Sequence, residues 1–419
     1  MGLENGFKQT DVGNIPIDWQ VKILGECLFR NPNYGLNAAA TSFKNSLPTY
    51  LRITDISEDG KFLKSDKVSV DHPLSKFYYL EEGDLVFART GASVGKTYLY
   101  DKNDGELVFA GFLIRVQANK NILDSNYLKF WTQTNIYSNW IRANSMRSGQ
   151  PGINGMEYKM LPIPVPPTKA EQTAIATALS DTDALITSLE KLIAKKRNIK
   201  QGAMQELLNG RERLAGFSGL WKDLSLGEIG EFRNGINKGK EDFGFGFPFV
   251  NLMDVFGIPT INSKSKLGLV NSNPVDRSTY NLKRGDVLFI RSSVKPTGVG
   301  LTSLVDEDLS DTVYSGFLIR YRDFDVFDHL FKKYCFYEEG FRQKIMDAST
   351  VSANTNINQE SLKRIRLSFP TEKTEQNAIA MILNDMDMEI TSLEAKLEKF
   401  KKLKFGMMQN LLTGKIRLV

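Results

Sequence analysis

The sequence predicts an α+β protein: two mixed α/β domains with strand-rich cores, and two long helices that pair as an antiparallel coiled coil. Three observations lead to this prediction. A long helical pattern occurs twice, each copy follows a region of short strand-like runs, and those two regions share several motifs. We therefore expect a pseudo-two-fold symmetric chain, divided into a first domain (1–167), a central helix (168–212), a second domain (213–370) and a C-terminal helix (371–419).

The helical pattern is an internal repeat. Residues 171–214 align with residues 375–418 without a gap, at a constant offset of 204 residues. Both copies contain an opening Glu-Gln pair, the string TSLE at 187–190 and 391–394, and a closing pattern of the form GxMQxLLxG. Self-similarity over such a length indicates a duplicated structural element.

Apolar residues in the two copies follow the spacing of a coiled-coil seam. In the second copy their steps alternate between four and three residues, and in the first copy Thr182 fills one seam position; this spacing differs from the wider stripe of a helix that packs on a globular core. A helix of about 40 residues would be roughly 60 Å long, and the other copy is the nearest candidate to cover its seam. The candidates for helix pairing or partner binding are Leu179, Ile186, Leu189, Ile193, Leu383, Ile390, Leu393 and Leu397.

Helix boundaries are also marked in the sequence. Two prolines precede Thr168, which forms a capping-box pattern with Glu171 at the start of the first copy. Pro370 precedes the second copy, where that pattern is absent. Gly210 and Gly414 stand where C-terminal helix stops are expected.

The two domains share strand-like motifs, but their sequences differ in the segments that connect those motifs. LEEGDLVFAR at 80–89 matches LKRGDVLFIR at 282–291, and GFLIR occurs at 111–115 and again at 316–320. Runs of β-branched and aromatic residues bounded by Gly, Pro, Asn and Asp favour strands. Each domain is therefore expected to keep a common framework of strands and to carry loops of its own.

Composition excludes several classes of protein. The net charge of +5 is compatible with a polyanionic partner without demonstrating one. Two distant cysteines, Cys27 and Cys335, and two isolated histidines, His72 and His329, argue against a disulfide framework, a metal site and histidine catalysis. The sequence shows neither an apolar run that could span a bilayer nor a signal peptide, which predicts a cytoplasmic protein with no membrane association.

The repeat suggests a geometry for DNA binding. If the helices pair antiparallel, a pseudo-two-fold axis relates the two domain–helix units and sets the domains at opposite ends. Two-fold related elements match the dyad of double-stranded DNA, and their separation fixes the spacing of the half-sites. Because the two domains differ in sequence, the two half-sites should differ as well.

The whole chain resembles the specificity subunit of type I restriction–modification systems. The opening FKQTDVGNIPIDW is similar to that family's N-terminal signature, the GDLVFAR and GDVLFIR strands to its target-recognition domains, and the twin EQxAIA helices to its spacer regions. The order and duplication of these motifs carry the resemblance. It implies a non-catalytic subunit that recognises an asymmetric, bipartite DNA sequence in host defence.

The resemblance also implies partners. Two DNA adenine methyltransferase subunits would bind through the helices and methylate adenine at N6, using S-adenosylmethionine that they bind themselves. Two translocating endonuclease subunits can join such an assembly. The present chain would then bind no cofactor of its own.

Two polar loops in each domain are candidates for DNA contacts. Loop A is the segment directly after the GDLVF-type strand, residues 89–96 in the first domain and 291–300 in the second. Loop B consists of residues 143–154 in the first domain and 347–358 in the second. Arginine and lysine contact phosphates or guanine, and side-chain amides pair with adenine edges. The alternative is that both are ordinary solvated loops. The candidates are Arg89, Ser93, Lys96, Arg291, Ser293 and Lys295 in loop A, and Arg147, Gln150, Asn354 and Asn356 in loop B.

Other polar residues have more than one interpretation. Asn154 and Asn358 lie in a shared frame, which favours structural or backbone-positioning roles over base contacts. The helix lysines either form solvated faces or lie along phosphates, where they would add salt-dependent affinity. These lysines are Lys195, Lys196, Lys200, Lys399, Lys401 and Lys402.

Three strings imitate motifs of cofactor-binding proteins. RTGASVGKT at 89–97 has Thr90 where a P-loop requires glycine, and the second domain lacks the GK step. NPNY at 31–34 has no glycine-rich turn for S-adenosylmethionine near it, and DFGFG at 242–246 runs into a strand rather than a helix. We interpret the first as a glycine-flexed loop and the other two as turns.

Two other classes of function remain as alternatives. A coiled-coil scaffold without DNA contact would explain the helices but not the shared framework with differing polar loops. A standalone methyltransferase or nuclease would need a cofactor turn or clustered carboxylates that the sequence lacks. For the helices themselves, we expect that adding or deleting whole heptads in one copy changes the unread gap of the target.

Overall fold

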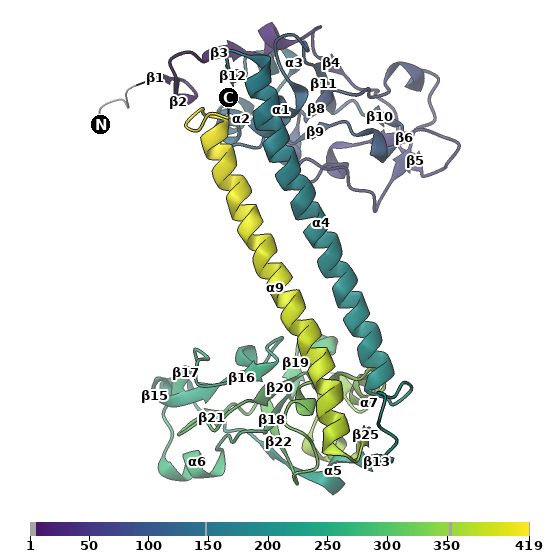
Figure 1. The fold of residues 1–419 in the computed structure, drawn as a ribbon, viewed down its shortest axis with the longest axis vertical. Helices are drawn as coiled ribbons and strands as arrows, with labels where there is room; N and C mark the ends of the chain where they lie inside the picture. Colours follow the sequence, from purple (N-terminus) through teal and green to yellow (C-terminus); the bar gives the residue numbers. More distant parts are fainter. Residues whose placement is uncertain (1–5, 147–148, 352–353, 419) are drawn as a thin grey trace. The chain divides into compact units, whose positions relative to one another are not determined.

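The computed structural model describes residues 6–146, 149–351 and 354–418, and it divides into two compact units. Unit 1 contains residues 1–190 and 395–419, and unit 2 contains residues 191–394. Each unit combines one globular domain with one part of each long helix, α4 (Lys169–Leu207) and α9 (Lys373–Leu411) (Figure 1). The compact units therefore divide the chain within the helices, not at their ends.

The first domain consists mainly of short strands. Its strands are β1 (Phe7–Thr10), β2 (Gly13–Pro16), β3 (Gln20–Ile23), β4 (Asn33–Tyr34), β5 (Thr41–Ser42), β6 (Thr49–Leu51), β7 (Val68–Ser69), β8 (Asp84–Ala88), β9 (Thr97–Leu99), β10 (Leu107–Phe109), β11 (Leu113–Gln117) and β12 (Pro162–Val165). Its α-helices are α1 (Ser125–Trp131), α2 (Asn135–Ser145) and α3 (Gly155–Tyr158). Its 3-10 helices are η1 (Leu24–Cys27), η2 (Ile53–Asp55), η3 (Ser75–Phe77), η4 (Gly91–Ser93) and η5 (Lys102–Asp104).

The second domain has the same character. Its strands are β13 (Trp221–Ser225), β14 (Gly230–Asn234), β15 (Phe243–Val250), β16 (Thr260–Ile261), β17 (Gly268–Val270), β18 (Val287–Ile290), β19 (Ser292–Ser293), β20 (Thr302–Val305), β21 (Val313–Tyr314), β22 (Leu318–Asp323), β23 (Thr350–Val351), β24 (Thr355–Asn356) and β25 (Arg366–Pro370). Its α-helices are α5 (Leu226–Ile229), α6 (Pro274–Thr279), α7 (Glu339–Asp347) and α8 (Gln359–Arg364). Its 3-10 helices are η6 (Lys240–Asp242), η7 (Leu252–Asp254), η8 (Pro296–Gly298), η9 (Phe331–Lys333) and η10 (Cys335–Tyr337).

A sheet built around the shared motifs forms the centre of each domain. Its strand order is β4-β11-β8-β9 in the first domain and β14-β22-β18-β20-β16 in the second. In both, the GDLVF-type strand pairs antiparallel with the GFLIR strand, so that Leu85 lies opposite Val116 and Val287 opposite Tyr321. All residues of β8 and β18 are buried, which explains why these strands appear in the sequence as continuous apolar runs.

Smaller sheets complete the framework. Each domain has one further sheet with a parallel pair, β10 with β6 in the first and β15 with β21 in the second. A two-stranded antiparallel sheet, β3 with β12 or β13 with β25, ends where the following long helix begins. The predicted fold class of mixed domains with strand-rich cores is confirmed.

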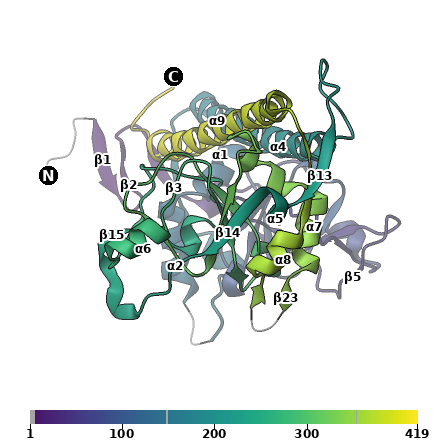
Figure 2. The same cartoon turned by 90° about the horizontal axis from the view of Figure 1, so that it is seen from below.

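The two long helices run antiparallel to each other within each unit (Figures 1 and 2). In unit 1, Asp183 of α4 lies 2.6 Å from Lys404 of α9, and Glu190, further along α4, contacts the earlier residue Lys401 at 3.3 Å. The same contacts recur in unit 2 at the offset of 204 residues. There, Asp387 lies 2.5 Å from Lys200, and Glu394 lies 2.5 Å from Arg197.

The ends of the helices insert apolar side chains into the domain cores. The GxMQxLLxG pattern supplies Met408, Leu411 and Leu412 to the core of unit 1, and Met204 and Leu208 to the core of unit 2. The starts of the helices contribute as well. These residues are Ile175, Ala176 and Leu179 in unit 1, and Ile379, Ala380 and Leu383 in unit 2.

A buried carboxylate marks the start of each long helix. Glu171 is 1% exposed and accepts hydrogen bonds from Arg417, while Glu375 is fully buried and accepts two from Arg213, at 2.6 and 2.8 Å. A buried carboxylate without a charged partner destabilises the folded state, so each arginine is needed at its position to pair with the glutamate. The same guanidinium groups lie over tryptophan rings at 5.9 Å for Arg417 with Trp19 and 5.7 Å for Arg213 with Trp221.

The glutamine of the Glu-Gln pair is buried too, and it fixes a loop of the domain. Gln172 accepts a hydrogen bond from the Asp124 N–H at 2.9 Å and donates one to the Ile122 carbonyl at 3.0 Å. Gln376 makes the equivalent bonds in unit 2, with Asp328 at 2.6 Å and Val326 at 3.2 Å. The shared EQ motif is therefore structural.

The predicted starts of the long helices lie within two residues of those observed, but α4 ends at Leu207 and α9 at Leu411, short of the predicted ends at 212 and 419. Thr168 accepts a hydrogen bond from the Glu171 N–H at 3.2 Å, but the Glu171 side chain bonds to Arg417 instead of returning to Thr168. The predicted capping box is therefore wrong in its second half. Gly210 and Gly414 follow the two helices with φ of +74° and +68°, the left-handed conformation that favours glycine at a helix end.

The predicted seam residues fall into two groups. Leu179 and Leu383 are fully buried and belong to the domain cores. The others lie along the paired helix segments: Ile186, Leu189, Ile193 and Ile390 are buried, and Leu393 and Leu397 are half-buried. The predicted antiparallel pairing of the helices is confirmed within each unit. In the described part of the chain, no helix has the length and apolar character needed to cross a membrane.

Candidate nucleic-acid interface

Loops A and B of the first domain lie side by side. The Gly91 N–H donates to the Pro151 carbonyl at 2.9 Å, and the Ile153 N–H donates to the Arg89 carbonyl at 2.9 Å. Thr90 and Gly152 form an antiparallel bridge between these two bonds. The structure thus joins two polar loops that are far apart in the sequence.

The second domain joins its loops in the same way. β19 of loop A pairs antiparallel with β24 of loop B, and β24 also pairs with β23. The Ile357 N–H donates to the Arg291 carbonyl at 2.9 Å, which repeats the bond between Ile153 and Arg89. Equivalent backbone contacts therefore hold loops of different sequence in both domains.

The arginine that opens loop A has a different support in each domain. The guanidinium of Arg89 lies 4.9 Å from the centre of the Tyr34 ring, and the Tyr34 hydroxyl accepts a hydrogen bond from the Gly155 N–H at 3.1 Å. Arg291 instead donates from Nη1 to the Gly316 carbonyl at 3.3 Å. Both arginines are half-buried and retain donors for a nucleic acid.

The remaining loop candidates differ in exposure. Gln150 is exposed, and its amide packs on Gly91, where an added Cβ would lie 2.7 Å from Nε2. Ser93 is half-buried in η4, and Lys295 is exposed at the start of η8. Asn354 is exposed, and its carbonyl accepts a hydrogen bond from Nδ2 of Asn356 at 2.9 Å. Arg147 lies outside the described residues.

Two loop A candidates are engaged within their domains, Lys96 in an ion pair and Ser293 by burial. Lys96 pairs with Glu58 at 2.8 Å and borders a cleft of about 700 Å³ that the end of α9 also lines. Ser293 is 6% exposed and faces Gly298, where an added Cβ would lie 2.4 Å from its hydroxyl. Their DNA contacts stay predictions that require the side chains to move.

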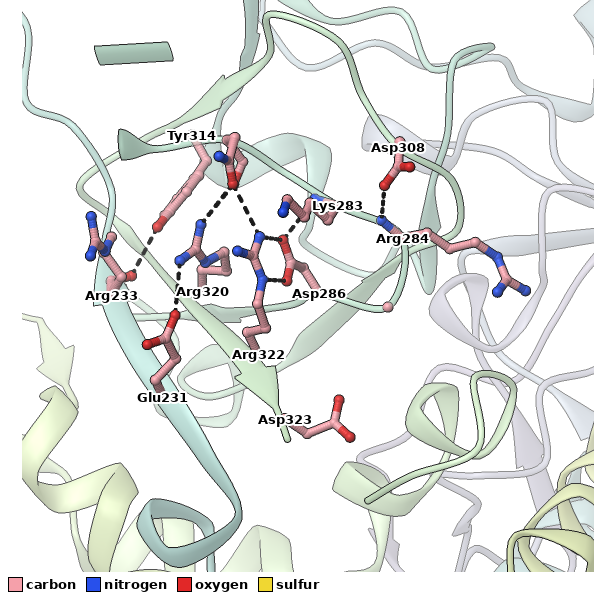
Figure 3. Close-up of polar contacts among 12 residues, drawn as sticks. Glu231, Arg233, Lys283, Arg284, Asp286, Asp308, Tyr314, Arg320, Arg322 and Asp323 are labelled. Carbon is pink, nitrogen blue, oxygen red and sulfur yellow. Dashed lines mark hydrogen bonds and ion pairs between the residues drawn. The ribbon is translucent and has the colours of Figure 1, made fainter. Parts of the chain in front are cut away.

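Charged residues of the shared motifs fasten the framework. In the first domain, Arg115 of GFLIR lies 3.3 Å from Asp84 of GDLVF, which also accepts a hydrogen bond from Gln117 at 2.6 Å. In the second domain, Asp286 accepts two hydrogen bonds of 2.6 Å from Arg322 (Figure 3). Those hydrogen bonds raise the pKa of Arg322.

Arg320, the arginine of the second GFLIR motif, has other partners. It is 2% exposed, donates to the Asn281 carbonyl at 2.8 Å, and lies 3.5 Å from Glu231 (Figure 3). Burial lowers its pKa. The motif arginines therefore brace strands and do not point toward a ligand.

The shared asparagines are structural, as expected. Asn154 caps α3 by accepting from the N–H groups of Met156 and Glu157 at 2.9 Å each. Asn358 caps α8 by accepting from the Ser361 N–H at 2.8 Å. Both anchor the end of loop B.

The helix lysines are partly engaged in ion pairs. Lys196 contacts Glu389 at 2.7 Å, and Lys200 and Lys401 pair with carboxylates of the opposite helix segment. Lys195, Lys399 and Lys402 are exposed. The exposed lysines remain compatible with phosphate contacts, while the paired ones stabilise the helix pairing.

The motif-like strings are explained by ordinary structure. The GKT of 95–97 leads into strand β9, whereas a P-loop leads into a helix. NPNY was expected to be a turn, but its Asn33 and Tyr34 form strand β4, so that expectation is wrong for these residues; Tyr34 supports Arg89. DFGFG was expected to be a turn, but it enters β15, whose pairing shifts register between Phe243 and Phe247; that expectation is wrong.

No candidate metal or thiol chemistry emerges from the described residues. They contain no group of three or more His, Cys, Asp or Glu residues that could hold a metal ion. Both cysteines are buried and free, and burial raises the pKa of Cys27 to about 11. His329 contacts Asp306 at 2.8 Å on the surface of the second domain.

Sequence reasoning missed two aromatic residues beside the loops. Phe112 and Phe317 are the second residues of the two GFLIR motifs, and these residues are 58% and 56% exposed. The whole motif is strand-like in sequence, but the strands begin only at Leu113 and Leu318. The signal that could have found them is the preceding glycine, which is typical of a turn.

Comparison with known proteins gives matches over the whole chain. A family model described as the type I restriction modification DNA specificity domain matches residues 16–201 and again residues 219–402. The putative type I restriction enzyme MjaX specificity subunit of Methanocaldococcus jannaschii is 29% identical over 433 residues, covering 99% of this chain and 97% of that protein. The type I restriction enzyme EcoKI specificity subunit of Escherichia coli is 25% identical over 335 residues, covering 74% and 69%.

Solved structures share the fold at low sequence identity. The crystal structure of a type I restriction-modification system S subunit from M. genitalium has a TM-score of 0.59 at 14% identity, and the match covers 98% of each chain. A chain from a structural study of complex assembly and conformational transition of the type I R-M system has a TM-score of 0.55 at 17% identity, covering 96% of this chain and 99% of that one.

Proposed function

The chain belongs to the family of type I restriction–modification DNA specificity subunits, and on that premise we propose that each domain reads one half of a split, asymmetric DNA target. Members of this family are non-catalytic DNA-recognition subunits. They act together with methyltransferase and restriction partners. A scaffold without DNA recognition is not favoured by the family match.

The observation that carries the proposal is the pairing of loops A and B in both domains. The same backbone bond, from Ile153 to Arg89 or from Ile357 to Arg291, holds them together. The side chains that the joined loops expose differ: Gln150 in the first domain, Lys295 and Asn354 in the second. A constant scaffold with variable polar groups suits the reading of two different sequences.

The assembly is the finer part of the proposal. We propose that two methyltransferase subunits bind one copy of this chain, supply S-adenosylmethionine and modify adenine, and that endonuclease subunits join them. The chain itself would bind no cofactor and would act in the cytoplasm. Native mass spectrometry of the co-expressed complex should give a 2:1 ratio of methyltransferase to this chain, and the isolated chain should not transfer a labelled methyl group.

A binding experiment tests the reading of two half-sites. The complex is titrated with a fluorescent duplex that carries the motif modified in the source genome, and with duplexes in which one or both halves are scrambled. We expect each scrambled half to weaken binding, and the preference to persist between low and moderate salt, because phosphate contacts alone are salt-sensitive and sequence-blind. Equal affinity for all duplexes at both salt concentrations would contradict the proposal.

A further inference from the structure

Two exposed phenylalanines occupy the same position in the two domains. Phe112 lies in the turn between β10 and β11, and Phe317 in the turn between β21 and β22. The flanking residues Leu113 and Leu318 are fully buried. An exposed apolar residue is common on a protein surface, but here the exposure is the same in two domains whose loops differ freely.

The backbone of each turn is tied to loop A. The Phe112 carbonyl accepts a hydrogen bond from the Arg89 N–H at 3.0 Å, and the Phe317 carbonyl accepts one from the Arg291 N–H at 2.8 Å. A second bond closes each turn, from Leu113 to Ala110 and from Leu318 to Ser315, at 2.8 Å in both cases. The backbone of the phenylalanine is therefore held beside the arginine that opens loop A, while the residue as a whole is more than half exposed.

The surroundings of the rings favour a nucleic acid over an apolar protein surface. Arg89 or Arg291 adjoins each phenylalanine through the backbone, and the polar residues of loops A and B follow. In the second domain, Val294 after β19 and Val351 at the end of β23 are 81% and 78% exposed. Apolar side chains among arginine and amide groups match base edges, where the thymine methyl group is apolar.

We propose that Phe112 and Phe317 contact nucleobases, each ring packing against a base of the half-site that its own domain reads. The inference rests on the proposed function and adds a base-contacting residue to each domain. A ring at this position supplies apolar contact with a base edge or face, and the neighbouring arginine supplies contacts to guanine or to phosphate. Neither contact requires a change in the framework, because both residues already lie at the surface.

The chain provides matched controls for this proposal. Phe29 is 76% exposed, and its N–H donates to the Gln117 carbonyl at the opposite end of β11, roughly 15 Å from Phe112 along the strand. Phe324 is 62% exposed and follows the far end of β22 in the second domain. Each control removes the same side chain from the same domain, outside the joined loops.

The experiment compares Phe112→Ala with Phe29→Ala, and Phe317→Ala with Phe324→Ala, in the complex with the methyltransferase subunits. Affinity is measured on the intact target and on duplexes with either half scrambled. We expect Phe112→Ala to weaken binding to the intact target by roughly 5- to 150-fold, the range for losing the contacts to one base pair of a duplex site. On DNA whose first-domain half is scrambled, the same variant should bind like the wild type.

Each other outcome decides against the inference. Affinity within twofold of the wild type, or an equal loss on all duplexes, would show that the ring does not contact a base of that half-site. A complex that no longer assembles with Phe112→Ala, while Phe112→Leu assembles and binds DNA normally, would assign the ring to a protein partner. If the wild-type complex shows no sequence preference, the proposed function fails instead.

Discussion

The two domains solve the same structural problem with different residues. In the first, Arg115 of the GFLIR motif and Gln117 both contact Asp84. In the second, the motif arginine contacts other groups, and Arg322 takes the equivalent carboxylate, Asp286. The domains share the pairing of their strands and the position of each loop. The side chains that maintain this arrangement differ between the two domains.

The contrast separates framework from recognition. Contacts between the long helices and the domain cores recur at a fixed sequence offset. Equivalent substitutions at these contacts should therefore have equal effects on the stability of the two units. Contacts within loops A and B differ, as the supports of Arg89 and Arg291 do. Changes there should act on one half-site only.

The largest expected effect tests the framework. Leu179→Ala and Leu383→Ala each leave a cavity at a fully buried core position, which should lower the free energy of unfolding by about 3 kcal/mol. Hydrogen–deuterium exchange should show faster exchange in unit 1 for the first variant and in unit 2 for the second. Leu403→Ala, at a 48% exposed position of α9, is the control and should change neither. If the two core variants lose unequal amounts of unfolding free energy, the two units are not structurally equivalent.

The buried carboxylates should give the next effect. Arg417→Gln or Arg213→Gln leaves Glu171 or Glu375 without its charged partner, and we expect each to cost about 2–3 kcal/mol in denaturant unfolding. The double variant Arg417→Gln with Glu171→Gln should be more stable than Arg417→Gln alone, because the unpaired charge is gone. If the double variant is the less stable of the two, the cost does not come from the buried charge.

A smaller effect should separate the two recognition faces. Tyr34→Ala removes the ring beneath Arg89 and should weaken binding to the intact target by about fivefold, as expected for a contact between a cation and an aromatic ring of about 1 kcal/mol. The loss should vanish when the first-domain half is scrambled. Tyr34→Phe keeps the ring and should bind within twofold of the wild type. A loss as large with phenylalanine would point to the Gly155 hydrogen bond instead.

The smallest effect concerns the exposed ion pairs between the helices. Glu190 and Lys401 are both more than 40% exposed, so Glu190→Gln should reduce stability by less than about 1 kcal/mol. Adding salt should reduce the difference in stability between the variant and the wild type, because salt screens exposed charges. A large, salt-independent loss in thermal unfolding would show that this pair matters more to the helix pairing than its exposure suggests.

Much of the fold could be predicted because its determinants are local or repeated. The alternation of apolar residues marked the helices, and Gly210 and Gly414 marked their ends. Long-range pairing left no such signal: the partner of Glu171 is Arg417, and the parallel pairing of β6 with β10 joins segments with no shared motif. The capping-box prediction failed for the same reason, since a distant arginine competes for the carboxylate.

The candidate site was predicted in part. Loops A and B were identified from composition, and the structure joins them in both domains. Which of their side chains are exposed depends on packing that the sequence does not reveal: Ser293 is buried, and Lys96 pairs with Glu58. Phe112 escaped notice because one string, GFLIR, contains an exposed ring and buried strand residues side by side.

The central claim is that each domain reads its own half of the target, and a domain exchange tests it most directly. Residues 1–160 are replaced by the corresponding segment of another family member that keeps an acidic residue and a tryptophan where Asp18 and Trp19 contact Arg417. The modified motif is then mapped by sequencing in cells that also produce the methyltransferase. We predict that one half of the motif changes and the other is retained. A change in both halves, or in neither, would contradict the account.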